Sequence, residues 1–245
     1  MMHIRSAIWK NISDELTIKF FQRSLSDNVV KIKMIANHDP SESIITITYK
    51  IFGNGLIDIQ QEIVTGKEKL PELPRFGMKM TLPKDFNRVT WFGRGPHESY
   101  WDRKTSAPIK VYSGSVWEQT FPYVRPQETG NKTDVRWMAL DNGTIGLLAI
   151  GQPVFDGSVH QYPYEDLENV PGDKRHGKLD IKPKDQIDWL IDYRQTGVGG
   201  DNSWGARTHQ KYTLDGKSAN YKYHFYLIPF TKGVDIMALS KINMN

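Results

Sequence analysis

At 245 residues, the chain is long enough for one large all-β domain or two smaller ones, with a substantial hydrophobic core in either case. The absence of cysteine excludes disulfides, thiol nucleophiles and zinc sites ligated by cysteine. The net charge is +4, from 32 Lys and Arg against 28 Asp and Glu that are scattered along the chain, so we expect no nucleic-acid partner.

The chain contains no apolar stretch of the length needed to cross a membrane, and no signal peptide is recognisable at its start. We therefore expect no membrane partner and a cytoplasmic location, with a periplasmic one left open. The opening residues read as a segment cut from, or made separately from, a larger protein.

Alternation of apolar and polar residues is the dominant pattern. It is clearest where Ile45, Ile47 and Tyr49 interleave with Thr46 and Thr48, a period of two that predicts a half-buried strand. Strands with the same period are predicted at residues 18–20, 30–34, 57–63, 78–82, 186–193 and 221–227.

Turn signals separate these strands. Gly53-Asn54-Gly55 predicts a hairpin between two of them. The only predicted helix is short, over residues 163–169, where Pro163 lies at a first-turn position ahead of Glu165 and Asp166. Many short strands without a linker favour a single all-β sandwich domain over residues 1–245.

The common catalytic motifs for phosphate binding, zinc proteolysis and serine hydrolysis are missing. Gly93-Arg94-Gly95-Pro96 superficially resembles a phosphate loop, but no helix follows it, and we interpret it as a structural turn. No two of the seven histidines lie close together at metal-ligand spacing, so no metal site is predicted. Glycosidase chemistry needs two facing carboxyl groups; the candidates have no distinguishing context and are interpreted as solvated or salt-bridged, namely Glu98, Asp102, Glu118, Glu128 and Asp134.

Two segments are denser in aromatic and charged residues. Residues 91–103 read WFGRGPHESYWDR, and residues 121–131 read FPYVRPQETGN, in which Arg125 and Glu128 could pair along an extended path. Such clusters line carbohydrate-binding clefts, and they also serve as buried polar braces in large sandwiches. The residues alone leave both interpretations open.

A glycine-rich loop follows the strand at 186–193. Its sequence, GVGGDNSWG over residues 197–205, allows tight turns, and Asp201, Asn202 and Ser203 can stabilise them with side-chain hydrogen bonds. Trp204 ends the loop. Its indole could stack on the apolar face of a sugar ring or cover the core of the domain, and the loop alone does not decide between them.

Taken together, WFGRGPHESYWDR, FPYVRPQETGN, Val135-Arg136-Trp137 and GVGGDNSW resemble the C-terminal small-chain domain of large bacterial β-galactosidases of glycoside hydrolase family 2. The resemblance covers residues 73–230 in matching order and spacing. Residues 1–72 fit the less distinctive first part of that domain. The match is looser at residues 164–167 and 175–176, where the connection is shortened.

The resemblance implies a β-supersandwich of the galactose-mutarotase-like kind. It implies a parent enzyme that hydrolyses terminal β-D-galactosides with retention, whose acid/base and nucleophile glutamates and whose Mg and Na ligands lie in a separate barrel domain. It therefore implies no catalytic residue, cofactor or metal in this chain. Trp204 matches the family's tryptophan platform for the substrate, whereas Asp201 and Asn202 are expected to shape the loop more than to touch sugar.

We therefore predict the C-terminal domain of a β-galactosidase, either a fragment or a separately encoded small subunit, which is inactive without its large partner. One alternative is a stand-alone galactose-binding module. Another is a mutarotase-like epimerase, for which His160 and Glu128 are the nearest acid and base candidates. A third is a domain that mainly holds the architecture of the enzyme together.

Overall fold

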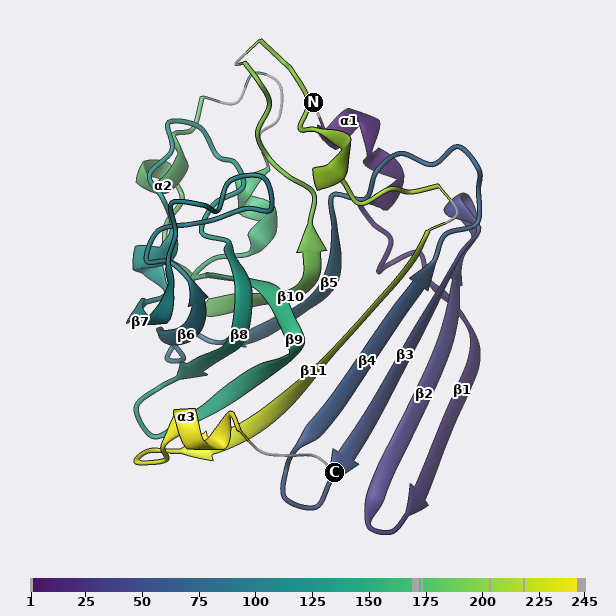
Figure 1. Ribbon diagram of the computed structural model, residues 1–245, viewed down its shortest axis with the longest axis vertical. Helices are drawn as coiled ribbons and strands as arrows, with labels where there is room; N and C mark the ends of the chain where they lie inside the picture. Colours follow the sequence, from purple (N-terminus) through teal and green to yellow (C-terminus); the bar gives the residue numbers. More distant parts are fainter. Residues whose placement is uncertain (1, 169–171, 173, 203, 218, 242–245) are drawn as a thin grey trace.

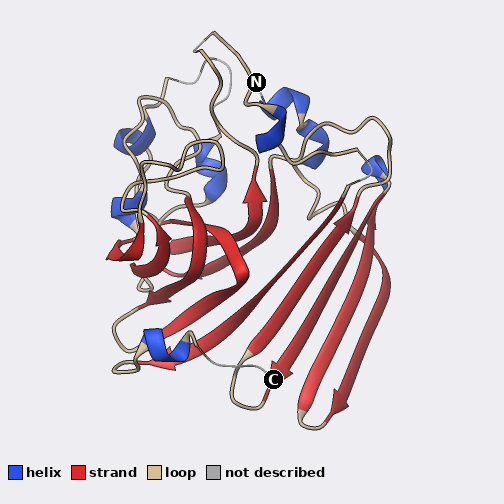
Figure 2. Cartoon of the chain, in the orientation of Figure 1, coloured by secondary structure: helices blue, strands red, loops and turns tan. Residues whose placement is uncertain are grey.

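The structure is a computed structural model, and it describes residues 2–168, 172, 174–202, 204–217 and 219–241. Within these residues, eleven strands form one antiparallel sheet that folds over into a sandwich (Figures 1 and 2). The strands are β1 (Thr17–Ser26), β2 (Val29–His38), β3 (Ser43–Phe52), β4 (Ile57–Val64), β5 (Arg75–Pro83), β6 (Arg88–Arg94), β7 (Ile109–Ser115), β8 (Lys132–Asp141), β9 (Ile145–His160), β10 (Gln186–Gln195) and β11 (Asn220–Thr231).

The strand order is β1-β2-β3-β4-β11-β9-β8-β6-β7, and β10 pairs with both β5 and β9. The long strand β9 connects the layers, since it pairs with β11 over residues 145–152 and with β10 over residues 156–160. The all-β sandwich and each strand predicted from alternation are confirmed, because a period-two pattern matches a strand, in which successive side chains point to opposite faces.

Helices are few and short in the part of the chain that the structure describes. They are α1 (Met2–Arg5), α2 (Gly177–Asp180) and α3 (Ile236–Leu239), together with five 3-10 turns. The helix predicted over residues 163–169 is a 3-10 helix at Tyr164–Leu167, and residue 169 lies outside the described residues. Prediction missed the three α-helices because four residues carry no periodic signal. No described helix has the length and apolarity to span a membrane.

The main core lies between the β3–β4–β11 layer and the β5–β10 layer. Ile47 and Ile59 from the first layer pack in the same buried cluster as Trp189 and Ile191 from the second. Each such side chain contributes about 1.5–3 kcal/mol when fully buried. The hydroxyl of Tyr223 donates to the carbonyl oxygen of Ile191 at 3.1 Å, which connects the two layers by a buried hydrogen bond.

Loops gather at one end of the sandwich, the upper end in Figure 1. The loop that follows β10 reaches furthest there, beyond the ends of the strands. At the opposite end of the first layer, hairpins close β1–β2 and β3–β4. The predicted Gly53–Gly55 turn joins β3 to β4, with Gly55 at a φ of 86° that favours glycine.

Candidate functional site

The glycine-rich loop after β10 presents Trp204 to solvent, with 93% of the residue exposed. Its turns depend on glycine at two positions. A Cβ on Gly200 would overlap with the carbonyl oxygen of Ala206, and one on Gly197 would overlap with the carboxylate of Asp102. The indole is thus outside the core, at the tip of a loop that closes tightly on itself.

Asp102 anchors the base of this loop. Its carboxylate accepts hydrogen bonds from the backbone N–H of Val198 at 3.2 Å, from the N–H of Gly199 at 2.7 Å, and from the hydroxyl of Thr208 at 2.9 Å. A carboxylate that accepts backbone N–H bonds holds a loop more firmly than a neutral acceptor does. Sequence reasoning treated Asp102 as one undistinguished acid, because its partners lie about a hundred residues away.

Two further side chains shape the tip. The Oδ1 of Asn202 accepts a hydrogen bond from the N–H of Trp204 at 2.9 Å, and Asp201 lies 2.9 Å from Nε2 of His209. Both contacts are internal to the loop, as expected for residues that set its conformation. The predicted contribution of Ser203 lies outside the described residues.

Aromatic side chains support the loop from below. Trp101 packs edge-on against Tyr212, with ring centroids 6.1 Å apart, and the guanidinium of Arg194 lies 4.3 Å from the centre of a Trp101 ring. The N–H of Gly197 donates to the carbonyl of Tyr212 at 2.8 Å. The loop therefore rests on a cation–π and aromatic stack that comes from three separate segments.

Glu98 joins the two dense motif segments. It accepts hydrogen bonds from the N–H of Gly130 at 2.8 Å and from Arg103 at 2.6 Å. The hydroxyls of Tyr100, Tyr123 and Thr129 also donate to it. Glu98 is a mostly buried carboxylate with five donors. This arrangement favours the interpretation of the cluster as a buried polar brace over that of a carbohydrate-binding cleft.

Glu128 does not pair with Arg125, so that expectation is wrong. Glu128 accepts a hydrogen bond from the hydroxyl of Tyr164 and lies 3.4 Å from Arg75, whereas Arg125 donates to the carbonyl of Arg175. The tertiary structure explains the difference, because it brings Glu128 to the guanidinium of Arg75 on β5.

His160 lies in the same buried cluster as Glu128. Its ring is 5.5 Å from that of Tyr164, and its Nδ1 is 3.2 Å from the hydroxyl of Tyr162. The residue is fully buried, and burial, together with the positive charges of Arg75 and Lys132, lowers its pKa to about 3. A neutral, inaccessible imidazole cannot serve as an acid toward a sugar in this conformation.

The remaining carboxylate candidates have structural partners. Although burial raises the pKa of Asp134, hydrogen bonds from Lys104 and Arg94 outweigh burial and lower that pKa. Glu118 is exposed and accepts from the N–H of Ser115 at 2.8 Å. None of these contacts leaves two carboxyl groups facing each other across an open space.

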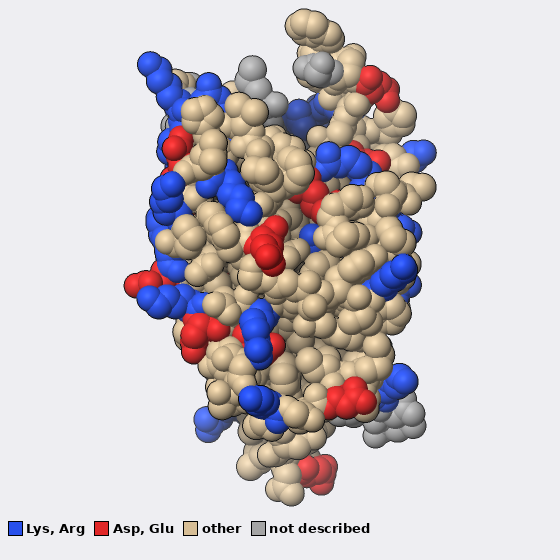
Figure 3. Space-filling view, turned by 90° about the vertical axis from the view of Figure 1, so that its left-hand side faces the viewer, with Lys and Arg blue, Asp and Glu red and all other residues tan. Residues whose placement is uncertain are grey.

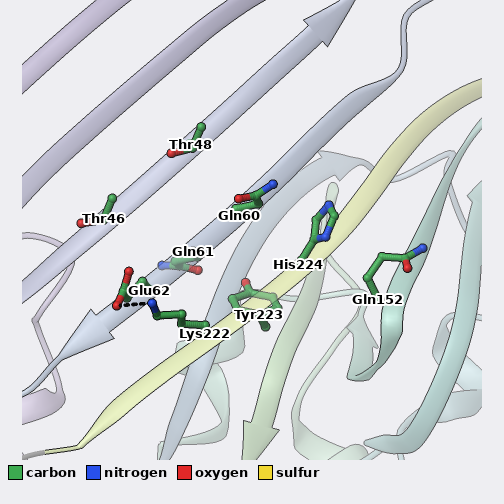
Figure 4. Close-up of a pocket in the computed structure, with 9 residues that line it drawn as sticks. All are labelled: Thr46, Thr48, Gln60, Gln61, Glu62, Gln152, Lys222, Tyr223 and His224. Atoms are coloured by element: carbon green, nitrogen blue, oxygen red, sulfur yellow. Dashed lines mark ion pairs between the residues drawn. The ribbon is translucent and has the colours of Figure 1, made fainter. Parts of the chain in front are cut away.

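A polar groove of about 390 Å³ lies on the outer side of the sheet (Figure 4). Thr48, Gln60 and Gln152 line it from β3, β4 and β9. Lys222 forms an ion pair with Glu62 at 3.0 Å, and the Nε2 of His224 lies 2.8 Å from Oδ1 of Asp58. The groove has no aromatic platform for a sugar ring comparable with Trp204.

No metal site emerges from the described part of the chain. It contains no group of three or more His, Asp or Glu side chains that could hold a metal ion. On the face shown in Figure 3, acidic and basic side chains are both present and are separated by large uncharged areas.

Comparison with known proteins places these features in a family. The family described as beta galactosidase small chain matches residues 2–227. The β-galactosidase of Priestia megaterium is 38% identical over 214 residues, which cover 87% of this chain and 20% of that enzyme. The β-galactosidase of Lactobacillus delbrueckii subsp. bulgaricus is 30% identical over 87% of this chain and 21% of the enzyme. The chain thus spans about one fifth of the length of these relatives.

Among solved structures, an α-galactosidase from Lactobacillus brevis aligns over 89% of this chain and 27% of its own, with 12% identity and a TM-score of 0.47. A galactose 1-epimerase from Lactobacillus acidophilus aligns over 86% of this chain and 66% of its own, with 8% identity and a TM-score of 0.44. Likeness at this level does not extend to mechanism. The match over residues 2–227 and the identity to full-length enzymes lead to one conclusion: this chain belongs to the β-galactosidase small chain family.

Proposed function

We propose that this chain is the C-terminal domain of a retaining β-galactosidase, and that its loop places Trp204 against the galactoside in an active site whose catalytic glutamates lie elsewhere in the enzyme. The observation that carries the proposal is the exposed indole on a loop held at its base by Asp102. A loop held at its base in this way loses less backbone entropy when its aromatic ring stacks on the C–H face of a sugar.

The contacts of the carboxylates in this chain support the proposal that the catalytic groups lie in another domain. Glu98, Glu128 and Asp134 are each engaged by hydrogen bonds or ion pairs within the sandwich. The acid/base and the nucleophile of a retaining mechanism would therefore come from another domain or subunit, and so would the ligands of the magnesium and sodium ions. The isolated chain is then expected to hydrolyse no galactoside above background.

The test is Trp204→Ala in the complete enzyme, assayed with lactose and a nitrophenyl galactoside. We expect a fall in kcat/KM that corresponds to a loss of about 1–3 kcal/mol in transition-state binding free energy, the range typical of aromatic stacking. Val198→Ala is the matched control, because Val198 is also apolar and exposed on this loop. Unchanged kinetics in the Trp204 variant would refute the platform.

Titration calorimetry of the isolated chain with galactose separates this proposal from the stand-alone module. The proposal predicts no measurable binding, since one indole on an exposed loop buries too little of a sugar. Saturable binding that Trp204→Ala abolishes would favour the module.

A further inference from the structure

We propose that β1 and the inner face of the β1–β2 hairpin form a docking surface for a β-strand supplied by the rest of the β-galactosidase. This inference rests on the chain being one part of a larger enzyme. It concerns the edge strand of the sheet, which is separate from the Trp204 loop, and no catalytic role is involved.

The inner face of the first layer is the face that packs against the β5–β10 layer. Its side chains become steadily more exposed from β4 to β1. Cross-strand pairing places Ile59, Tyr49, Ile32 and Arg23 on one row of that face. Ile59 is buried, Tyr49 and Ile32 are half-buried, and Arg23 is exposed. The second layer therefore covers β4 and part of β3 and leaves the face of β1 open.

The open part of this face is apolar apart from Arg23. On β1 it carries Ile18, Phe21 and Leu25, which are 58%, 62% and 73% exposed. Their cross-strand partners, Ala36, Met34 and Val30, continue the apolar surface toward the core. Side chains of this kind on a strand normally face a covering layer, because exposing them forfeits the free energy of burial.

The edge of β1 is open as well. Among the described residues β1 pairs with β2 alone, and all ten of its residues are exposed. A long edge strand with apolar side chains is a template for another strand, and proteins normally cover such an edge. An added strand would satisfy the free backbone groups of β1, and its own apolar side chains would pack beside Phe21 and Leu25 on the inner face.

Charge argues for an acidic partner and against a second copy of this chain. The hairpin carries Lys19, Arg23, Lys31 and Lys33 against a single acid, Asp27. Arg23 lies between Phe21 and Leu25 on the inner face and makes no ion pair with a described residue. Two copies joined through β1 would place Lys19 and Arg23 of both copies on adjacent strands, whereas a strand with a carboxylate opposite Arg23 would neutralise that cation.

The relatives provide the source of such a strand. The chain corresponds to 20% of the Priestia megaterium enzyme and 21% of the Lactobacillus delbrueckii enzyme. About four fifths of a β-galactosidase of that size lies outside the region aligned with this chain. The occupant is therefore a segment of that remainder.

The experiment compares substitutions on the two faces of the same strand. Phe21→Asp and Leu25→Asp change the inner face, and Gln22→Asp and Ser24→Asp are matched controls on the outer face. Each chain is mixed with the remainder of the β-galactosidase, expressed as a separate polypeptide, and the dissociation constant is measured by sedimentation. We expect the inner-face variants to weaken assembly by at least about tenfold and the controls by less than about threefold.

Equal assembly by all four variants would overturn the proposal. Arg23→Glu should also weaken assembly while Arg23→Lys should not, and indifference to both would remove the predicted carboxylate. If the chain alone forms dimers that Leu25→Asp dissociates, the occupant is a second copy and the proposal is wrong.

Hydrogen exchange is measured on the chain without substitutions, so a variant that fails to fold cannot affect the result. The amides of residues 17–26 should exchange more slowly in the assembled enzyme than in the isolated chain, and unchanged exchange would contradict the added strand. The outcome is separable from that of the proposed function. Trp204→Ala should change kinetics in a normally assembled enzyme, whereas Leu25→Asp should change assembly and leave the kinetics of the assembled fraction unaltered.

Discussion

The carboxylate of Asp102 accepts a hydrogen bond from the backbone N–H of Gly199 at 2.7 Å, across 97 residues of sequence. This contact connects the aromatic segment of residues 91–103 to the glycine-rich loop, two stretches that the sequence shows as separate motifs. The position of Trp204 therefore depends on a residue that does not itself reach the tip of the loop.

Replacing Asp102 should loosen the loop without unfolding the sandwich. Asp102→Ala removes three hydrogen bonds from Val198, Gly199 and Thr208 to a carboxylate, a kind of bond worth about 1.5–3 kcal/mol. We expect faster hydrogen exchange at the amides of Val198 and Gly199, and a fall in kcat/KM of the complete enzyme in the same direction as for Trp204→Ala. Unaltered exchange at both amides would show that Asp102 is not the anchor.

Gly200→Ala should open the loop for a steric reason. The added Cβ would overlap with the carbonyl oxygen of Ala206, a backbone atom that cannot rotate away. We expect changed chemical shifts confined to residues 197–208 and weaker substrate binding by the complete enzyme. Gly53→Ala is the matched control, since nothing lies within 4 Å of its Cβ position, and equal effects of the two substitutions would refute this reasoning.

Glu98→Gln should destabilise the fold. The substitution retains the shape of the side chain but removes the charge that Arg103 pairs with at 2.6 Å. It also replaces one carboxylate oxygen with an amide NH2, which then faces either the N–H donor of Gly130 or the hydroxyl donor of Tyr123. Breaking a mostly buried, multiply bonded carboxylate costs about 2–4 kcal/mol. Urea unfolding of the isolated chain measures the loss, with Glu68→Gln, at an exposed position, as a control expected within about 0.5 kcal/mol of the original chain.

His160 should make the free energy of unfolding depend on pH. Its pKa is lowered to about 3 in the folded chain, against 6.5 for an unperturbed imidazole. As the pH falls, the imidazole is protonated in the unfolded chain at a higher pH than in the folded chain. The free energy of unfolding therefore decreases between pH 6.5 and pH 3, by up to about 1.4 kcal/mol per pH unit.

The variant His160→Gln tests this dependence because it has no titrating group at the position. Between pH 7 and pH 4 it should lose less stability than the original chain does, even if it is less stable at pH 7. His97→Gln, at an exposed imidazole, serves as the control. Parallel pH profiles for the His160 variant and the original chain would contradict the lowered pKa.

The sequence by itself determined the family and seven of the eleven strands, but not β6, β7, β8 and β9. Alternation such as that of Ile45, Ile47 and Tyr49 is a local property of the chain, because a strand turns successive side chains to opposite faces whatever lies beyond it. The glycines of residues 197–205 likewise indicate a tight loop through their own backbone freedom. The spaced motifs then identified the small-chain domain, which the comparison with known proteins supports.

Only the tertiary structure decided which polar groups meet. Glu128 joins Arg75 in place of Arg125, Glu98 collects donors from two segments, and Asp102 reaches the Trp204 loop. Such partners are set by how the sheet folds over, which brings together residues from 25 to 97 positions apart that no local pattern relates. The uncovered face of β1 has the same origin, since its alternation predicts burial and only the extent of the second layer leaves it exposed.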